Sequence, residues 1–239
     1  MLAVYNREMQ AYFLTPIGYV FMGSFLLIQG IFFTFGNIFA QSSDFSSMFS
    51  NLSFIFMLVV PILTMRLMSD ERRNKSDQLL LTSPVSLLSI VVGKFLAACT
   101  VFLVTLGITG IYVLILSAFG VISVPEVLVN YFGFFLTGCC LIAVGLLISA
   151  MTESQVTAAI ATFGIILLFF LMDGMAAMIT APFLAFLVAA LQWLSLFQRF
   201  EAFSAGIFSL TGVIYMLSFA AVFLYLTVSV IEKRRWSEG

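Results

Sequence analysis

Long apolar stretches separated by short polar segments dominate the sequence. Stretches long enough to cross a membrane as a helix lie at residues 17–40, 49–68, 95–118, 127–150, 156–179 and 210–231. An α-helix rises ~1.5 Å per residue, so about 20 apolar residues span the ~30 Å hydrocarbon core of a bilayer. The pattern predicts an all-α integral membrane protein with six transmembrane helices, which form a single domain over residues 1–239.

An amphipathic segment precedes the first apolar stretch. Residues 1–16 repeat apolar side chains at helical spacing, and Pro16 interrupts the run before the first span. The predicted apolar face consists of Leu2, Tyr5, Met9, Tyr12 and Phe13, and the opposite face of Asn6, Arg7 and Gln10. This pattern predicts an interfacial helix that lies on the inner leaflet.

A second unusual segment, residues 181–206, lies between the last two predicted spans. Its first part is apolar but too short to cross, and its second part repeats apolar residues at helical spacing: Trp193, Leu196, Phe197, Phe200 and Phe203. We predict a re-entrant or interfacial hairpin at the outer surface. An ordinary amphipathic loop helix explains the pattern equally well.

Composition supports the membrane assignment and narrows the chemistry. The chain is 62% hydrophobic and only 9% charged, with a net charge of −1 and no histidine. Nothing in it resembles a basic surface for nucleic acid, and no imidazole is available as a base or metal ligand. The three cysteines, Cys99, Cys139 and Cys140, lie in apolar runs without a ligand spacing, which favours small buried side chains over disulfides or metal binding.

The distribution of basic residues predicts the orientation. With the N-terminus inside, the outer segments contain only Arg199, whereas the inner segments contain Arg7, Arg66, Arg72, Arg73, Lys75, Lys94, Lys233, Arg234 and Arg235. Cytoplasmic segments are enriched in Lys and Arg, so both termini are expected in the cytoplasm. A seventh span within residues 181–206 would move the C-terminal basic cluster outside, and we therefore reject it.

Charge is concentrated in residues 69–86, SDERRNKSDQLLLTSPVS, between the second and third predicted spans. A polar helical part is followed by three leucines, and Pro84 prevents the helix from continuing. This combination favours a short cytoplasmic helix that docks into a groove of a soluble partner. The alternative is a solvated loop that only follows the positive-inside rule.

The sequence contains no motif for nucleotide binding and no set of intramembrane carboxylates for ion coupling. The Gly93-Lys94 pair has Leu88 and Phe95 where a P-loop requires Gly and Ser or Thr, so we expect no nucleotide site and no enzyme activity in this chain. Asp173 is the one acid well inside an apolar run, and its position predicts an interfacial rather than an ion-coupling role. We therefore expect no cofactor or metal in this chain.

Several segments together resemble permease subunits of ABC-2-type transporters. They are the N-terminal amphipathic segment leading into Thr15-Pro16-Ile17-Gly18, then PILTMRLMSDERRNKSDQLLLTSPVSLLSIVVGK, ISAMTESQVTAA and VIEKRRW. The sequence is most similar to the gliding-motility-associated permeases, which are related to the permeases of copper-enzyme maturation systems. The resemblance covers nearly the whole chain.

The resemblance implies a six-span half-transporter of the bacterial inner membrane. It implies a partner ABC ATPase dimer that binds ATP and Mg, a second permease copy in a homodimer or heterodimer, and allows for an accessory membrane subunit. The segment after the second span would be a coupling helix. The implied docking residues are Asp70, Glu71, Arg72, Arg73, Lys75, Asp77, Gln78, Leu79, Leu80 and Leu81, with Thr152, Glu153 and Ser154 as a second contact.

The expected function is therefore an ATP-driven permease. Spans poor in charge disfavour small ions and fit an amphipathic, lipidic or peptide-like substrate, and the expected direction of transport is export. Two alternatives remain open at this point. One is a membrane anchor or assembly factor for an ATPase complex, and the other is a stand-alone secondary transporter or channel.

Overall fold

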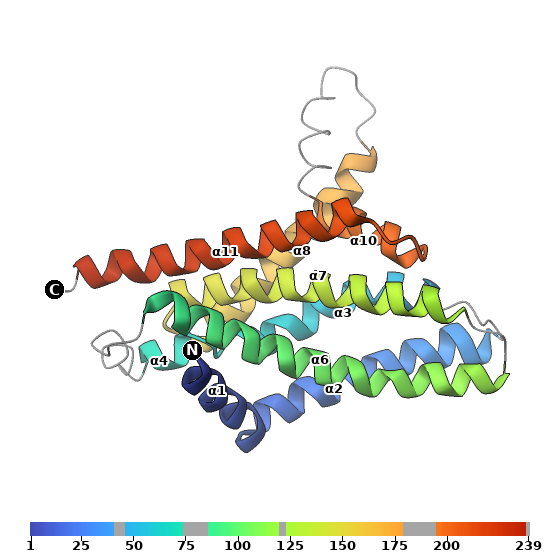
Figure 1. The fold of residues 1–239 in the computed structure, drawn as a ribbon, viewed down its shortest axis with the longest axis horizontal. Coiled ribbons are helices and arrows are strands. Elements are labelled where there is room, and N and C mark those ends of the chain that lie inside the picture. The colour runs from blue at the N-terminus through green and yellow to red at the C-terminus, as the bar shows by residue number, and fades with distance from the viewer. Residues whose placement is uncertain (41–45, 74–85, 120–122, 179–194, 238–239) are drawn as a thin grey trace.

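The computed structural model of the chain describes residues 1–40, 46–73, 86–119, 123–178 and 195–237. Within these ranges every regular element is a helix. Long helices run side by side along the molecule, and both termini lie toward the end that carries α4 (Figure 1). The long elements are α2 (Pro16–Phe33), its π-helical extension η1 (Thr34–Phe39), α3 (Ser46–Thr64), α6 (Leu87–Phe119), α7 (Val124–Met151), α8 (Gln155–Met178) and α11 (Leu210–Ser237). The short ones are α1 (Leu2–Leu14), α4 (Ser69–Arg73) and α10 (Leu196–Ser204).

Five helical segments in the described part of the chain are long and apolar enough to cross a membrane. They are Pro16–Phe39, Leu87–Ala118, Val124–Met151, Gln155–Met172 and Leu210–Arg234. They correspond to the predicted first, third, fourth, fifth and sixth spans, so the chain is a multi-pass helical membrane protein. The predicted second span, residues 49–68, differs: α3 ends at Thr64, and a turn separates it from α4. A crossing by α3 stays a prediction.

Helix α7 forms the centre of the bundle. It packs against α3, α6, α8, α10 and α11, and most of its side chains are buried. Phe134 on α7 lies against phenylalanines of three other long helices, with ring centroids 4.2 Å from Phe56, 6.0 Å from Phe102 and 6.2 Å from Phe25. These rings belong to α2, α3, α6 and α7. Part of the phenylalanine content of the chain therefore fills the bundle interior instead of facing lipid.

Helix α1 is present as predicted before the first span. Thr15 adopts an extended conformation before Pro16, which ends α1 and starts α2 in a new direction. The buried side chains of α1 are Val4 and Tyr12, whereas Leu2 is 77% exposed. Tyr12 of the predicted apolar face is thus buried, Leu2 of the same face is exposed, and α1 packs mainly on α6. That this face lies on the inner leaflet stays a prediction.

Helix α10 lies in the described part of the predicted outer hairpin. Residues 179–194 lie outside the described ranges. The hydroxyl of Ser195 accepts a hydrogen bond from the backbone N–H of Gln198 and thereby caps the helix. The buried side chains of α10 include Leu196, Phe197, Phe200 and Phe203, which pack mainly onto α7. The helical spacing was thus predicted correctly, and the apolar face meets the bundle.

Candidate functional site

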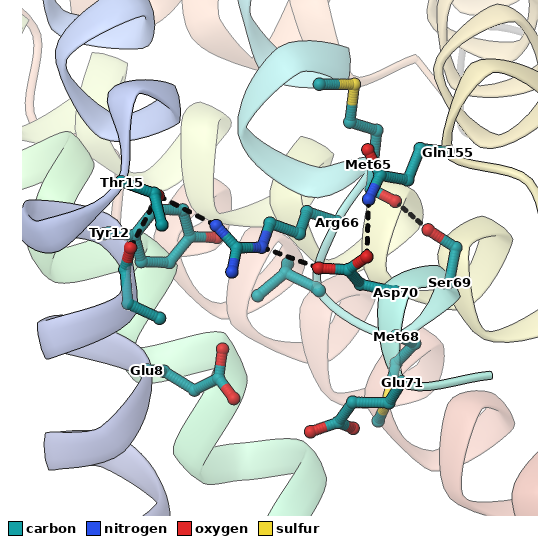
Figure 2. Close-up of polar contacts among 12 residues, drawn as sticks. Glu8, Tyr12, Thr15, Met65, Arg66, Met68, Ser69, Asp70, Glu71 and Gln155 are labelled. Atoms are coloured by element: carbon teal, nitrogen blue, oxygen red, sulfur yellow. Dashed lines mark hydrogen bonds and ion pairs between the residues drawn. The ribbon is translucent and has the colours of Figure 1, made fainter. Parts of the chain in front are cut away.

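A tight connection between α3 and α4 builds the first part of the site. Ser149 of α7 accepts hydrogen bonds at its Oγ from the backbone N–H groups of Met68 (3.0 Å) and Ser69 (3.1 Å). The same hydroxyl donates to the carbonyl of Met65, 3.2 Å away. The hydroxyl of Ser69 also donates to the Met65 carbonyl, as Figure 2 shows. One buried side chain of α7 therefore holds the end of α3 and the start of α4.

Replacement of Ser149 should loosen this connection. Ser149→Ala leaves two buried backbone N–H groups without their acceptor, each at a cost of about 1–3 kcal/mol. We expect a lower thermal unfolding temperature and faster hydrogen exchange of the Met68 and Ser69 amides. Ser218→Ala is the matched control, because Ser218 is exposed and donates only to the Tyr215 carbonyl. Equal exchange rates in both variants would contradict the assignment.

Asp70 joins three parts of the chain. One carboxylate oxygen accepts from Nε of Arg66 at 2.9 Å, and the other accepts from Nε2 of Gln155 at 2.7 Å (Figure 2). Arg66 also donates to the hydroxyl of Thr15 at 2.8 Å. A chain of polar contacts thus runs from the α1–α2 connection through α4 to the first residue of α8. It orients α4 against the bundle.

Arg72 connects α4 to the turn between α7 and α8. Its guanidinium donates to Glu153 at 2.7 Å, across 81 residues of sequence. Arg72 is largely buried, with 17% of its side chain exposed, whereas Glu153 is 72% exposed. The pair is therefore a modest source of stability, but it places two separate segments on one surface.

A second group of charges lies between α1, α4 and α6, and we call Arg7, Glu8, Glu71 and Lys94 the Lys94 cluster. Lys94 is 1% exposed and donates to the Leu67 carbonyl at 2.6 Å, and its ammonium lies 2.9 Å from Glu8 and 3.0 Å from Glu71. Arg7 contacts both carboxylates. Burial alone would raise the pKa of Glu8, but the ammonium of Lys94 and the guanidinium of Arg7 outweigh it and lower the pKa below its usual value.

The sequence model of a family described as ABC-2 family transporter protein matches residues 10–234. The chain belongs to the ABC-2 transporter family. No curated protein matches the chain. Membership of this family implies partnership with an ABC ATPase and agrees with a permease subunit.

The structure of this ABC-2 chain brings together the described members of the predicted docking set. Three members of that set are exposed: Arg73, Glu153 and Ser154. Three others make polar contacts within the chain: Asp70, Glu71 and Arg72. Thr152 donates to the Ile148 carbonyl and ends α7. Lys75, Asp77, Gln78, Leu79, Leu80 and Leu81 lie outside the described residues.

Sequence reasoning missed Glu8 and Lys94 of this ABC-2 chain as site residues. The third span was predicted to start at residue 95, whereas α6 starts at Leu87 and places Lys94 about two turns inside a helix. A lysine on a buried helical face indicates a nearby carboxylate or other hydrogen-bond acceptor, because a buried charge requires a partner. The sequence alone does not identify Glu8 as that partner. Among the described residues, no group of three or more His, Cys, Asp or Glu side chains could hold a metal ion.

Proposed function

We propose that the chain is the permease subunit of an ATP-driven ABC transporter, and that separate ATPase subunits bind ATP and Mg. The ATPase docks on the loop of residues 70–83, which begins within α4, and on the turn at Thr152, Glu153 and Ser154. One observation carries this proposal: the Arg72–Glu153 pair joins the two predicted contact segments, which are far apart in sequence, on one surface. A partner can therefore contact both at once.

The attachments of α4 support a role in transmitting force. Ser149 connects its start to α7, Asp70 connects it to α8 through Gln155, and Arg72 connects it to Glu153. A displacement of α4 by a moving ATPase therefore reaches several long helices through short hydrogen bonds. In the proposed mechanism, ATP-driven closure of two ATPase subunits shifts the bundle between inward-facing and outward-facing states.

The remaining parts of the proposal rest mainly on the amino-acid sequence. We propose α3 as the sixth crossing, a location in the bacterial inner membrane, cytoplasmic termini and assembly with a second permease copy. Both termini and α4 lie toward one end of the bundle, which supports an even number of crossings (Figure 1). The proposed activity is export of an amphipathic, lipidic or peptide-like substrate, and the proposed subgroup is the gliding-motility-associated permeases.

Charge reversal on α4 tests the docking surface. The tagged chain is purified in mild detergent from its own membrane, and stoichiometric partners are identified. Arg73→Glu should reduce recovery of the ATPase by about 10-fold or more, because like charges across an interface cost several kcal/mol. Insertion of the chain should not change, since Arg73 is exposed.

Lys233→Glu is the matched control, because Lys233 is an exposed basic residue on the predicted cytoplasmic part of α11. It should leave ATPase recovery near that of the unaltered chain. Purification of the unaltered chain without an ATPase would contradict the proposed function. An equal loss with Arg73→Glu and Lys233→Glu would contradict α4 as the docking surface.

A further inference from the structure

Lys94 occupies an unusual position for a lysine. It belongs to α6, one of the helices long and apolar enough to span a membrane, and its side chain is 1% exposed. A buried ammonium is tolerated only when opposite charges and hydrogen-bond acceptors surround it. Here two carboxylates and one backbone carbonyl provide that environment.

The groups around Lys94 come from separate elements. Glu8 belongs to α1 and Glu71 to α4, and the Leu67 carbonyl lies in the turn that leads into α4. Arg7 contacts both carboxylates from the more exposed side, with 52% of its side chain exposed. Two cations and two carboxylates therefore balance each other in the Lys94 cluster. Removing one member leaves a buried charge without compensation, which is strongly destabilising.

Two tyrosines also hold α1 on the bundle, but neither reaches α4. The hydroxyl of Tyr5 donates to Thr100 of α6 at 3.1 Å, and that of Tyr12 donates to the Leu63 carbonyl of α3 at 2.9 Å. Glu71 of α4 contacts Arg7 of α1 directly and Glu8 of α1 through Lys94. A separate path, from Asp70 through Arg66 to Thr15, reaches the connection between α1 and α2. The Lys94 cluster thus connects the middle of α1 to α4 through charged groups.

We propose that Lys94 is a positioning residue that couples the amphipathic helix α1 to α4, so that a displacement of α4 also displaces α1. This inference rests on the proposed function, because the displacement comes from the docked ATPase. The cluster transfers the motion to a helix that lies outside the spans and carries an exposed leucine at each end, Leu2 and Leu14. The nucleotide state of the ATPase then changes the position of α1 relative to the bundle.

Distance measurements between spin labels test this coupling. Labels are placed at Leu2 of α1 and Ile160 of α8, which are 77% and 67% exposed, in a background without the three native cysteines. Lys94→Met removes the charge and keeps an unbranched side chain, and Glu8→Gln removes a compensating charge with little change in volume. Lys233→Met is the matched control on an exposed lysine of α11.

In the isolated chain, the unaltered protein and Lys233→Met should give a narrow distance distribution, and both cluster variants a broad one. In the ATPase complex, ATP should shift the distance in the unaltered protein. Both cluster variants should lose that shift although the ATPase remains bound. A purely structural role would not remove an ATP-dependent shift while the complex stays intact.

Three results would overturn the inference. They are a narrow distribution in both cluster variants, an ATP-dependent shift that survives in them, and loss of membrane insertion in both, which would assign the cluster to folding alone. The proposed function fails separately, when no ATPase binds the unaltered chain. The distributions of the isolated chain still decide in that case whether Lys94 holds α1 in a fixed position on the bundle.

Discussion

Gly138→Ala is expected to disrupt the packing of the bundle. A Cβ atom at this position of α7 would lie 2.3 Å from Cε1 and 2.7 Å from Cζ of Phe102. The Phe102 ring cannot move aside easily, because the rings of Phe25, Phe56 and Phe134 surround it at centroid distances of 6.1, 5.8 and 6.0 Å. Overpacking of this kind costs typically about 1–3 kcal/mol and occasionally more. We expect a marked fall in thermal unfolding temperature and in the yield of monodisperse protein.

Gly107→Ala provides the control for this prediction. Gly107 belongs to α6, and no atom lies within 4 Å of a Cβ added there. Alanine is favoured over glycine in a helix by about 1 kcal/mol, so this variant should be as stable as the unaltered chain or more stable. Similar unfolding temperatures for the two variants would show that α7 does not approach α6 as closely as described.

Gly18→Ala is expected to detach α1 from the bundle. A Cβ atom at Gly18 would lie 2.4 Å from the carbonyl oxygen of Tyr12. This atom belongs to the backbone and cannot rotate away, so the angle between α1 and α2 must change. The hydrogen bond from the Tyr12 hydroxyl to the Leu63 carbonyl and the contact between Glu8 and Lys94 would then be lost. The measurement is hydrogen exchange of α1 amides, which should be at least about 10-fold faster, equivalent to a loss of about 1.4 kcal/mol.

The control for Gly18→Ala is Gly23→Ala, which lies on the same helix. Gly23 is exposed, and no atom lies within 4 Å of a Cβ added there. Exchange of α1 amides should not change in this variant. Unchanged exchange in Gly18→Ala as well would contradict the close contact between the start of α2 and the end of α1.

Most of the long helices could be predicted from hydropathy. The predicted spans at residues 127–150 and 156–179 differ from α7 and α8 by few residues, because a helix in lipid must satisfy its own backbone and be apolar over its length. The end of α3 could not be predicted in this way. Residues 65–68 are apolar except for Arg66, but the backbone N–H groups of Met68 and Ser69 donate to the hydroxyl of Ser149, and the continuous helix ends at Thr64.

The candidate site was only partly predictable for a similar reason. The charged segment after α3 and the turn at Thr152, Glu153 and Ser154 were identified from composition and family resemblance, and their proximity became evident only from the Arg72–Glu153 pair. Glu8 and Lys94 are 86 residues apart, and periodicity carries no information on which helices contact each other. Which distant charges pair depends on how the helices pack against each other in three dimensions.

The role of Ser149 also sets an order of events during biosynthesis. The residue that holds the start of α4 is synthesised 81 residues after Met68. At ~5–20 residues per second this corresponds to a delay of about 4–16 s. The α4 region therefore completes its attachment only after α7 has entered the membrane beside α3. A nascent chain that stops before α7 lacks the attachments of α4 to Ser149, Glu153 and Gln155, so a partner that recognises the complete arrangement discriminates against incomplete chains.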